Sequence, residues 1–196
     1  MGSTWTAIAA TTAAVTNRFV TTTNMIVGAY TVANPSPVWG GGCLVTCTHT
    51  QVGGVTDTLG TIDFVGTGPS GQAVSETLTP VSASTVTGTK IFRTITSVTG
   101  VGWVINTGND TIVMGCAAGS YPIAGSGTLR AIVVNTTAAA AITVSDARGT
   151  IATLKSSIAE GTYYYDLDVA GWLKVATTST NDITVVHTAS LPISIA

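Results

Sequence analysis

Apolar and polar residues alternate with a period of two along most of this chain. In "AITVSD", Ile142 and Val144 fall on one face while Thr143 and Ser145 fall on the other, as a half-buried strand requires. No helical period longer than one or two turns stands out. Strand-favouring Thr and Val are abundant and strong helix formers are scarce, so the pattern predicts an all-β protein.

The expected strands fall into two sets, separated by Gly, Pro, Asn and Asp at a spacing typical of sandwiches or barrels. The first set comprises 43–50, 58–65, 73–80, 90–98 and 110–117; the second comprises 128–135, 141–146, 150–157, 162–169, 172–177 and 182–187. A break rich in small residues, "AAGSYPIAGSG", lies between them. It places a domain boundary near 120–126.

We therefore expect two β-sandwich domains, jelly-roll-like or immunoglobulin-like, with extended terminal arms. The expected parts are an N-terminal arm at 1–17, domains at 18–120 and 128–188, a linker at 121–127 and a C-terminal tail at 189–196. The arms contain no clear alternation and could dock on neighbouring molecules, ordering as they add a strand to a sheet edge.

Composition adds that the surface carries very little charge. Only 8% of residues are charged and the net charge is -2, against about 25% charged residues in ordinary soluble domains. Thr, with 38 residues, supplies the polar positions instead. We expect a free monomer to self-associate, because solubility depends on net charge.

The small number of basic residues argues against nucleic-acid partners, and other features of the sequence argue against a membrane span and secretion. Seven Lys and Arg residues are too few for sequence-independent nucleic-acid binding, which needs clustered cations. No run approaches 18 apolar residues, so no membrane span is expected. The start lacks the basic residues of a secretory signal, and three cysteines suit a reducing cytoplasm.

The segment "CLVTCTH" raises the question of a metal site at Cys43, Cys47 and His49. On a strand these side chains share a face, but Cys43 and Cys47 lie roughly 13 Å apart. That distance excludes both joint chelation and a disulfide. A row of buried thiols is the expected alternative, and Cys116 is likewise expected in the core.

Candidate catalytic groups are sparse. Asp166 and Asp168 in "DLD" would lie about 7 Å apart on one strand face, a spacing seen in some calcium and glycosidase sites, yet a solvated face beside a turn is the expected role. His49 and His187 are the only imidazoles, and no nucleophile turn accompanies them. We therefore expect a non-enzymatic protein with no catalytic residue, cofactor or metal.

Aromatic residues offer a further kind of site. Alternation sends Tyr163 and Tyr165 to one face of a strand and Tyr164 to the other. Core or subunit-interface packing is the favoured interpretation, with sugar stacking as the alternative. The four tryptophans in question are Trp5, Trp39, Trp103 and Trp172.

Two of the seven basic residues lie in "VTGTKIFRTITSV" (86–98), which is expected to form one long strand. There Ile91, Arg93 and Ile95 would share one face and Lys90 would belong to the other, so the two cations are expected at an interface or its rim. The candidate interface residues are Trp5, Arg18, Lys90, Arg93 and Trp172.

Two stretches resemble structural proteins of tailed double-stranded DNA bacteriophages. "GTGPSGQAVSETLTPVSASTVTGTKIFRTITSV" (66–98) is similar to a virion pattern in which an "SETLT" strand precedes "GTK-x-F-x-T-x-TSV", and residues 129–177, ending in "GTYYYDLDVAGWLKVAT", resemble another small phage β-sandwich. The resemblance implies a structural protein of the virion and leaves head decoration, neck, tail and fibre open. The favoured role is a capsid decoration or cement protein, assembled into the virion in the host cytoplasm. Its implied partners are the major capsid protein and further copies of itself, as a trimer or else a dimer.

Two other functions stay open. A tail-fibre, baseplate or head-fibre protein would recognise a host surface through exposed Trp and Tyr side chains. A polysaccharide-active enzyme would have to rely on Asp166 and Asp168. A shallow exposed aromatic patch would favour recognition, whereas large apolar surfaces at edges and arms would favour a cement protein.

Overall fold

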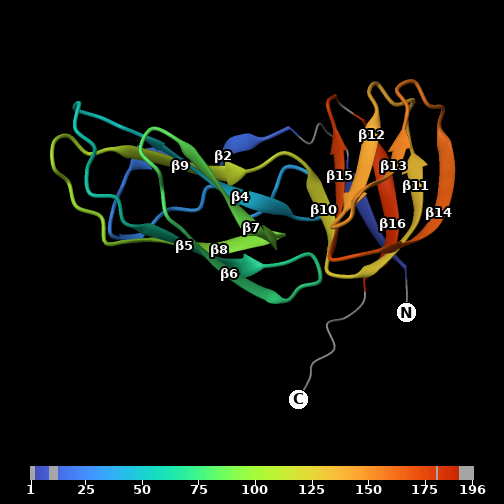
Figure 1. The fold of residues 1–196 in the computed structure, drawn as a ribbon, viewed down its shortest axis with the longest axis horizontal. Helices are drawn as coiled ribbons and strands as arrows, with labels where there is room; N and C mark the ends of the chain where they lie inside the picture. Colours follow the sequence, from blue (N-terminus) through green and yellow to red (C-terminus); the bar gives the residue numbers. More distant parts are fainter. Residues whose placement is uncertain (1–2, 9–12, 180, 190–196) are drawn as a thin grey trace, which may run out of the picture. The chain divides into compact units, whose positions relative to one another are not determined.

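The computed structural model describes residues 3–8, 13–179 and 181–189, and this part of the chain is all-β (Figure 1). None of the described residues forms a helix that could cross a membrane. The strands are β1 (Thr4–Ile8), β2 (Val15–Asn24), β3 (Gly28–Ala29), β4 (Cys43–Thr50), β5 (Thr61–Thr67), β6 (Ala73–Leu78), β7 (Thr85–Phe92), β8 (Thr94–Val101), β9 (Thr111–Cys116), β10 (Ser120–Ala124), β11 (Gly127–Val134), β12 (Ile142–Asp146), β13 (Gly149–Leu154), β14 (Gly161–Val169), β15 (Trp172–Thr177) and β16 (Ile183–Ala189).

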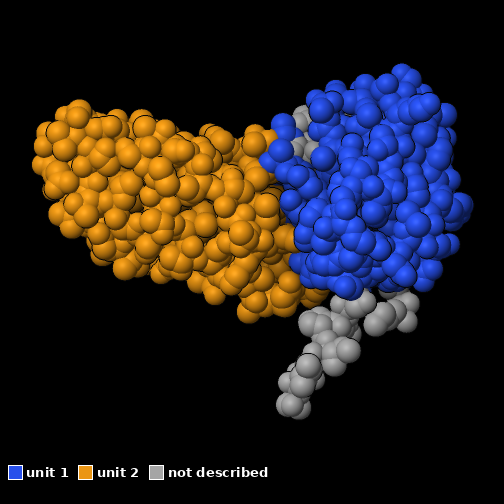
Figure 2. Space-filling view, in the orientation of Figure 1, with its two compact units in different colours: residues 1–13, 38–42, 118–196 blue, residues 14–37, 43–117 orange. Residues whose placement is uncertain are grey.

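The strands belong to two compact units, which Figure 2 colours separately. Unit 1 consists of residues 1–13, 38–42 and 118–196, and unit 2 consists of residues 14–37 and 43–117. Unit 1 contains the sheets β1-β16-β11-β14 and β10-β15-β12-β13; unit 2 contains β2-β9-β4-β7 and β3-β8-β5-β6. All four sheets are antiparallel, an arrangement consistent with the β-sandwich class.

The core of unit 2 combines aromatic rings with buried thiols. Phe64 of β5 and Phe92 of β7 come from different sheets, and their ring centroids lie 6.4 Å apart. Cys43, Cys47 and Cys116 are fully buried and free, as the row of buried thiols predicted. Burial of these apolar side chains supplies the main favourable term for holding the two sheets together.

The segment expected to be one strand over 90–98 is instead two strands in different sheets. β7 pairs with β4, β8 pairs with β5, and the chain changes sheets at Arg93. Ile91 and Phe92 are consecutive and both buried, which breaks the alternation of a single strand. The one-strand prediction was wrong because it treated this broken alternation as a strand passing beneath a partner rather than as a corner between sheets.

The expected N-terminal arm contains regular structure, and so does the one described residue of the expected C-terminal tail. Residues 4–8, assigned above to an arm, form β1 and pair with β16, and Ile8 is fully buried. β2 begins at Val15, inside the same expected arm. The expected C-terminal tail lies outside the described residues except for Ala189, the last residue of β16.

The expected linker at 121–127 is also structured, because it contains most of β10. Tyr121 exchanges two backbone hydrogen bonds with Gly42, at 3.0 and 2.7 Å. Trp39 donates its indole N–H to the carbonyl of Gly119 at 3.0 Å. These bonds attach residues 38–42 to unit 1, although the sequence suggested that they belong with the first strand set.

A buried carboxylate fastens two turns of unit 1. Asp146 accepts hydrogen bonds from the Arg148 guanidinium at 2.6 and 3.0 Å and from the backbone N–H of Ala170 at 3.0 Å. Arg148 also donates to the carbonyl of Asp168 at 2.6 Å. The β12–β13 turn and the β14–β15 turn are therefore held together by one charge-assisted cluster.

The cluster predicts an acid-sensitive contribution to stability. Hydrogen bonds from Arg148, set against the opposing effect of burial, lower the pKa of Asp146 from 3.8 to about 2. The unfolded chain therefore binds a proton more readily than the folded one, so this stabilisation is complete above about pH 5 and is lost between about pH 4 and pH 2.

We expect Asp146→Asn to lower the free energy of unfolding of unit 1 at pH 7 by about 1 kcal/mol, a modest value because Arg148 is largely exposed. The variant should also lose stability less steeply than the wild type between pH 4 and pH 2 in thermal unfolding experiments. Glu160→Gln, which alters an exposed carboxylate of unit 1 outside the cluster, is the matched control. Equal acid sensitivity of wild type and Asp146→Asn would contradict the assignment.

Candidate functional site

One end of unit 2, drawn at the left in Figure 1, is built around a buried acid and imidazole network. His49, the next-to-last residue of β4, places Nε2 3.0 Å from Oδ2 of Asp110. Asp110 directly precedes β9, and both side chains have no exposed surface. A buried carboxylate is stable only where hydrogen bonds replace its hydration, and the surrounding loops provide them.

Asp57 completes the network through reciprocal bonds with Asp110. Each residue donates its backbone N–H to the other's carboxylate, at 3.0 and 2.9 Å. Asp110 also accepts from the N–H of Val52, and Asp57 from those of Asn106 and Thr107. Each carboxylate thus accepts three hydrogen bonds. Together these bonds connect loop 51–60 with loop 102–110.

These hydrogen bonds control the ionisation of Asp57. Burial alone would raise its pKa, but the backbone donors of Asp110, Asn106 and Thr107, together with nearby His49, outweigh burial and lower the pKa. The ionised form is therefore the one that the folded loops favour, and its stabilising effect is lost as the pH falls through the acid range.

The two ring nitrogens of His49 are both occupied. Nδ1 accepts a hydrogen bond from the backbone N–H of Ala83 at 3.0 Å, so the proton of the neutral ring lies on Nε2 and is donated to Asp110. An imidazole bonded in this way cannot accept a proton from a nucleophile without breaking the network. His49 is thus a structural residue that fastens the 80–84 loop.

The cysteines of this unit are poor nucleophiles. Burial, with a contribution from the neighbouring Cys116, raises the pKa of the Cys43 thiol well above its usual value. Burial also raises the pKa of Cys47 to about 12. Neither thiol supplies the thiolate that covalent catalysis or metal binding requires at neutral pH. Among the described residues, no group of three or more His, Cys, Asp or Glu side chains is placed to hold a metal ion.

The loops fastened by this network expose a cluster of aliphatic side chains, which we call the aliphatic end. They lie on loops 24–28, 51–60, 79–84 and 102–110 and on the last residue of β8. The only ionisable residues in these loops are Asp57 and Asp110, both buried. The exposed members are Ile26, Val27, Val52, Val55, Val81, Val101, Val104 and Ile105.

Hydrogen bonds between the loops make this surface a single feature. Asn109 donates to the carbonyl of Met25, and the backbone of Met25 donates to that of Asp110. Thr58 and Val104 form an isolated antiparallel bridge. These bonds connect loops 24–28, 51–60 and 102–110, so less backbone freedom remains to be lost when a partner binds.

The candidate interface residues divide between the two units. Trp5 and Trp172 belong to unit 1, where Trp5 is 66% exposed on β1 and Trp172 packs edge-on against Tyr121 at 5.8 Å between ring centroids. Within unit 1 these two tryptophans lie on different sheets. Only Trp5 presents most of its ring to solvent.

Arg18, Lys90 and Arg93 belong to unit 2 and each donates to a backbone carbonyl. Arg18 bonds to Ser36 at 2.7 Å, and Lys90 bonds to Ser75 at 2.6 Å. Arg93 makes a long bond of 3.4 Å to Pro69. Lys90 and Arg93 therefore attach the β7–β8 corner to β6 and to the preceding turn, a structural role that sequence inspection did not anticipate.

Asp166 and Asp168 are both exposed, as expected for a solvated face. Asp166 has a φ of 49° inside a bulge of β14 and bonds to Arg130 at 2.8 Å. The bulge interrupts the alternation from which their common face was predicted. The tyrosines follow the prediction, because Tyr164 is exposed while Tyr163 and Tyr165 are half-buried.

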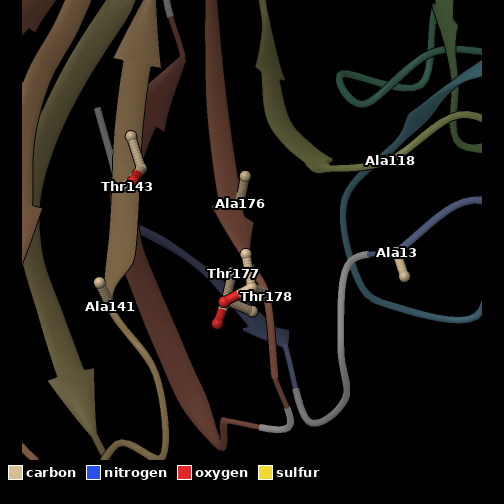
Figure 3. Close-up of a pocket in the computed structure, with 7 residues that line it drawn as sticks. All are labelled: Ala13, Ala118, Ala141, Thr143, Ala176, Thr177 and Thr178. Carbon is tan, nitrogen blue, oxygen red and sulfur yellow. The ribbon is translucent and has the colours of Figure 1, made fainter. Parts of the chain in front are cut away.

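A hollow of about 470 Å³ in unit 1 has a chemically uniform lining (Figure 3). The described residues around it offer methyl and hydroxyl groups alone and no ionisable group. Such a lining supports neither proton transfer nor metal binding. The residues are Ala13, Ala118, Ala141, Thr143, Ala176, Thr177 and Thr178.

Removing Asp110 tests the network that holds the aliphatic end. In Asp110→Asn, the amide group cannot accept all three hydrogen bonds, so buried donors lose their partner. We expect the free energy of unfolding of unit 2 to fall by about 2–4 kcal/mol. Amide hydrogen exchange should accelerate within loops 51–60 and 102–110.

Asp63→Asn is the matched control, because Asp63 accepts one exposed hydrogen bond from Thr77 on neighbouring strands. It should cost less than about 1 kcal/mol and leave exchange in those loops unchanged. Similar exchange rates in wild type and Asp110→Asn would show that the network does not hold the loops.

Comparison with known proteins finds no counterpart: no family model matches the chain, and neither does any curated protein or solved structure. The phage family suggested by residues 66–98 and 129–177 therefore stays a prediction.

Proposed function

We propose that this chain is a non-enzymatic structural component of a bacteriophage virion, a decoration or cement protein that binds and stabilises the capsid shell. One observation carries the proposal: an aliphatic end on hydrogen-bonded loops whose described residues expose no charged side chain. An uncharged aliphatic surface of this kind is costly in water and is stabilised by permanent burial against a partner. The resemblance of residues 66–98 and 129–177 to phage structural proteins selects the virion as the setting.

The proposed partner is the major capsid protein, with the aliphatic end seated on it. Further copies of the chain would assemble as a trimer, or else as a dimer, around a symmetry axis of the shell. Each unit would then be a β-sandwich domain of the jelly-roll-like or immunoglobulin-like kind. The action is mechanical, since buried area added across a seam opposes the separation of capsid subunits.

The chemistry of the described residues supports a role without catalysis. His49 is committed to Asp110 and Ala83, and the thiols of Cys43 and Cys47 are held protonated by burial. Asp166 is paired with Arg130 rather than with a second carboxylate. These assignments support a binding function and give the polysaccharide-active alternative no matched pair of acids.

A second candidate function is host-surface recognition by a tail-fibre, baseplate or head-fibre protein. The observation that favours it is the exposure of Trp5 and Tyr164 around one groove of unit 1. Aromatic side chains of this exposure act as recognition groups in many binding sites.

Cryo-electron microscopy of the particle that carries this chain tests the proposal. We expect density for both units on the outer face of the capsid, with loops 51–60 and 102–110 against the shell. Location at a tail tip would favour the recognition alternative, and absence from the particle would refute both. Truncation of residues 1–17 is a poor test of docking, because it removes β1 and the start of β2.

A substitution in the aliphatic end tests docking directly. Ile105→Ser exchanges an exposed aliphatic side chain for a hydroxyl, and we expect about tenfold weaker binding to empty shells lacking this protein. Val65→Ser, at an exposed position on β5, is the control and should bind normally. Equal binding of both variants in a sedimentation assay would show that the aliphatic end is not the docking surface.

A further inference from the structure

A groove of about 530 Å³ crosses the outer face of the β1-β16-β11-β14 sheet in unit 1. One cross-strand row supplies four of its lining residues. Trp5 pairs with Val186, Val186 with Ala131, and Ala131 with Tyr164. Two aromatic side chains therefore stand at the ends of a row whose middle positions are small and aliphatic.

The spacing of the strands fixes the width of the groove. Three strand-to-strand steps separate Trp5 from Tyr164, which places their Cα atoms roughly 14 Å apart. Val186 and Ala131 are almost fully buried between them, whereas Trp5 is 66% and Tyr164 80% exposed. The middle of the row is therefore shielded from solvent, whereas the rings of Trp5 and Tyr164 remain accessible to a ligand.

A pair of facing bulges adds polar groups to one side of this row. Arg130 is the extra residue of β11 against β16, and Tyr165 with Asp166 bulges from β14 opposite it. The Arg130 guanidinium bonds to Asp166 at 2.8 Å, and both side chains also line the groove. Thr162, on the next row, adds a hydroxyl.

The backbone of Asp166 is strained. Its φ of 49° lies in the left-handed region, which costs a residue other than glycine free energy. Glycine would relieve that strain at an exposed bulge. The fold therefore places the Asp166 carboxylate in the groove lining despite the free-energy cost of this backbone conformation. Bulges beside binding sites commonly aim a side chain in this way.

We propose that this groove binds a neutral oligosaccharide. Trp5 and Tyr164 stack on the apolar C–H faces of successive sugar rings, and Arg130, Asp166 and Thr162 hydrogen-bond to sugar hydroxyls. The charged side chains among the described residues that line the groove are one cation and one anion, already paired, so the site favours a ligand without net charge. Apolar walls with a few convergent polar groups are the usual composition of a small-ligand site.

This inference concerns unit 1 alone and goes beyond the proposed capsid role. A cement protein could carry such a groove, and so could a recognition protein. Substitutions in the groove and in the aliphatic end therefore separate the two proposals.

The experiment titrates the full chain with cellotriose, chitotriose and maltotriose. Trp39 and Trp103 are buried and Trp172 is half-buried, so acrylamide quenching of tryptophan fluorescence reports chiefly on Trp5. We expect at least one trisaccharide to protect Trp5, with a Kd of about 1 mM or tighter measured by calorimetry. Trp5→Ala and Tyr164→Ala should each weaken that binding about fivefold or more.

Asp166→Gly distinguishes a binding role from a structural one. Glycine adopts the bulge conformation without strain, so this variant should unfold at the same temperature or higher while binding the trisaccharide at least threefold more weakly. Val104→Ser, in the aliphatic end, is the control and should bind the sugar normally.

Three results would overturn the proposal. The first is that none of the three sugars protects Trp5 at 10 times the expected Kd. The second is that binding is unchanged in Trp5→Ala, Tyr164→Ala and Asp166→Gly. The third is that wild type self-associates in sedimentation velocity and Trp5→Ala or Tyr164→Ala abolishes that association, which would assign the groove to contact between copies.

Discussion

The reciprocal bonding of Asp57 and Asp110, with His49 beside them, sets the form of one whole end of unit 2. The two carboxylates are buried, and charged groups are rare in protein interiors. Backbone N–H groups from two loops replace their hydration. The hydrogen bonds of the network depend on one another, because losing one carboxylate acceptor leaves several buried donors without a partner. Its consequence at the surface is a set of loops that are joined by hydrogen bonds and expose aliphatic side chains.

The two units expose different kinds of surface that carry little charge. Unit 2 concentrates its exposed aliphatic residues at one end, where a partner can bury them together. Unit 1 instead exposes Trp5 and Tyr164 across a groove in which the charged side chains of the described lining, Arg130 and Asp166, neutralise each other. Thr residues supply the polar faces of many strands in both units. Few charged residues therefore lead to two surfaces with distinct chemistry.

Strand periodicity predicted much of the fold but not its corners. β4 and β15 begin and end at the residues expected from alternation, and most other strands differ by a few residues. The corner at Arg93 was missed because Ile91 and Phe92 are both buried, a pattern that alternation alone cannot distinguish from an irregular strand. β10 was missed because "SYPIA" contains no alternation, and its hydrogen bonds are to distant Gly42 and to β15.

The candidate site was harder to predict than the strands. Trp5 and Tyr164 were singled out from the sequence, but their shared row depends on β1 and β14 lying in one sheet with β16 and β11 between them. Asp57 and Asp110 gave no signal, since they are separated by 53 positions and each sits in an ordinary turn sequence. Their partners are mostly backbone N–H groups, which carry no sequence signature.

Hydrogen exchange of the chain bound to its particle, compared with the free chain, measures most directly whether the aliphatic end is a docking surface. We predict strong additional protection of the backbone amides in loops 24–28, 51–60, 79–84 and 102–110 on the particle. Unchanged exchange in these loops, with new protection confined to other segments, would contradict that role.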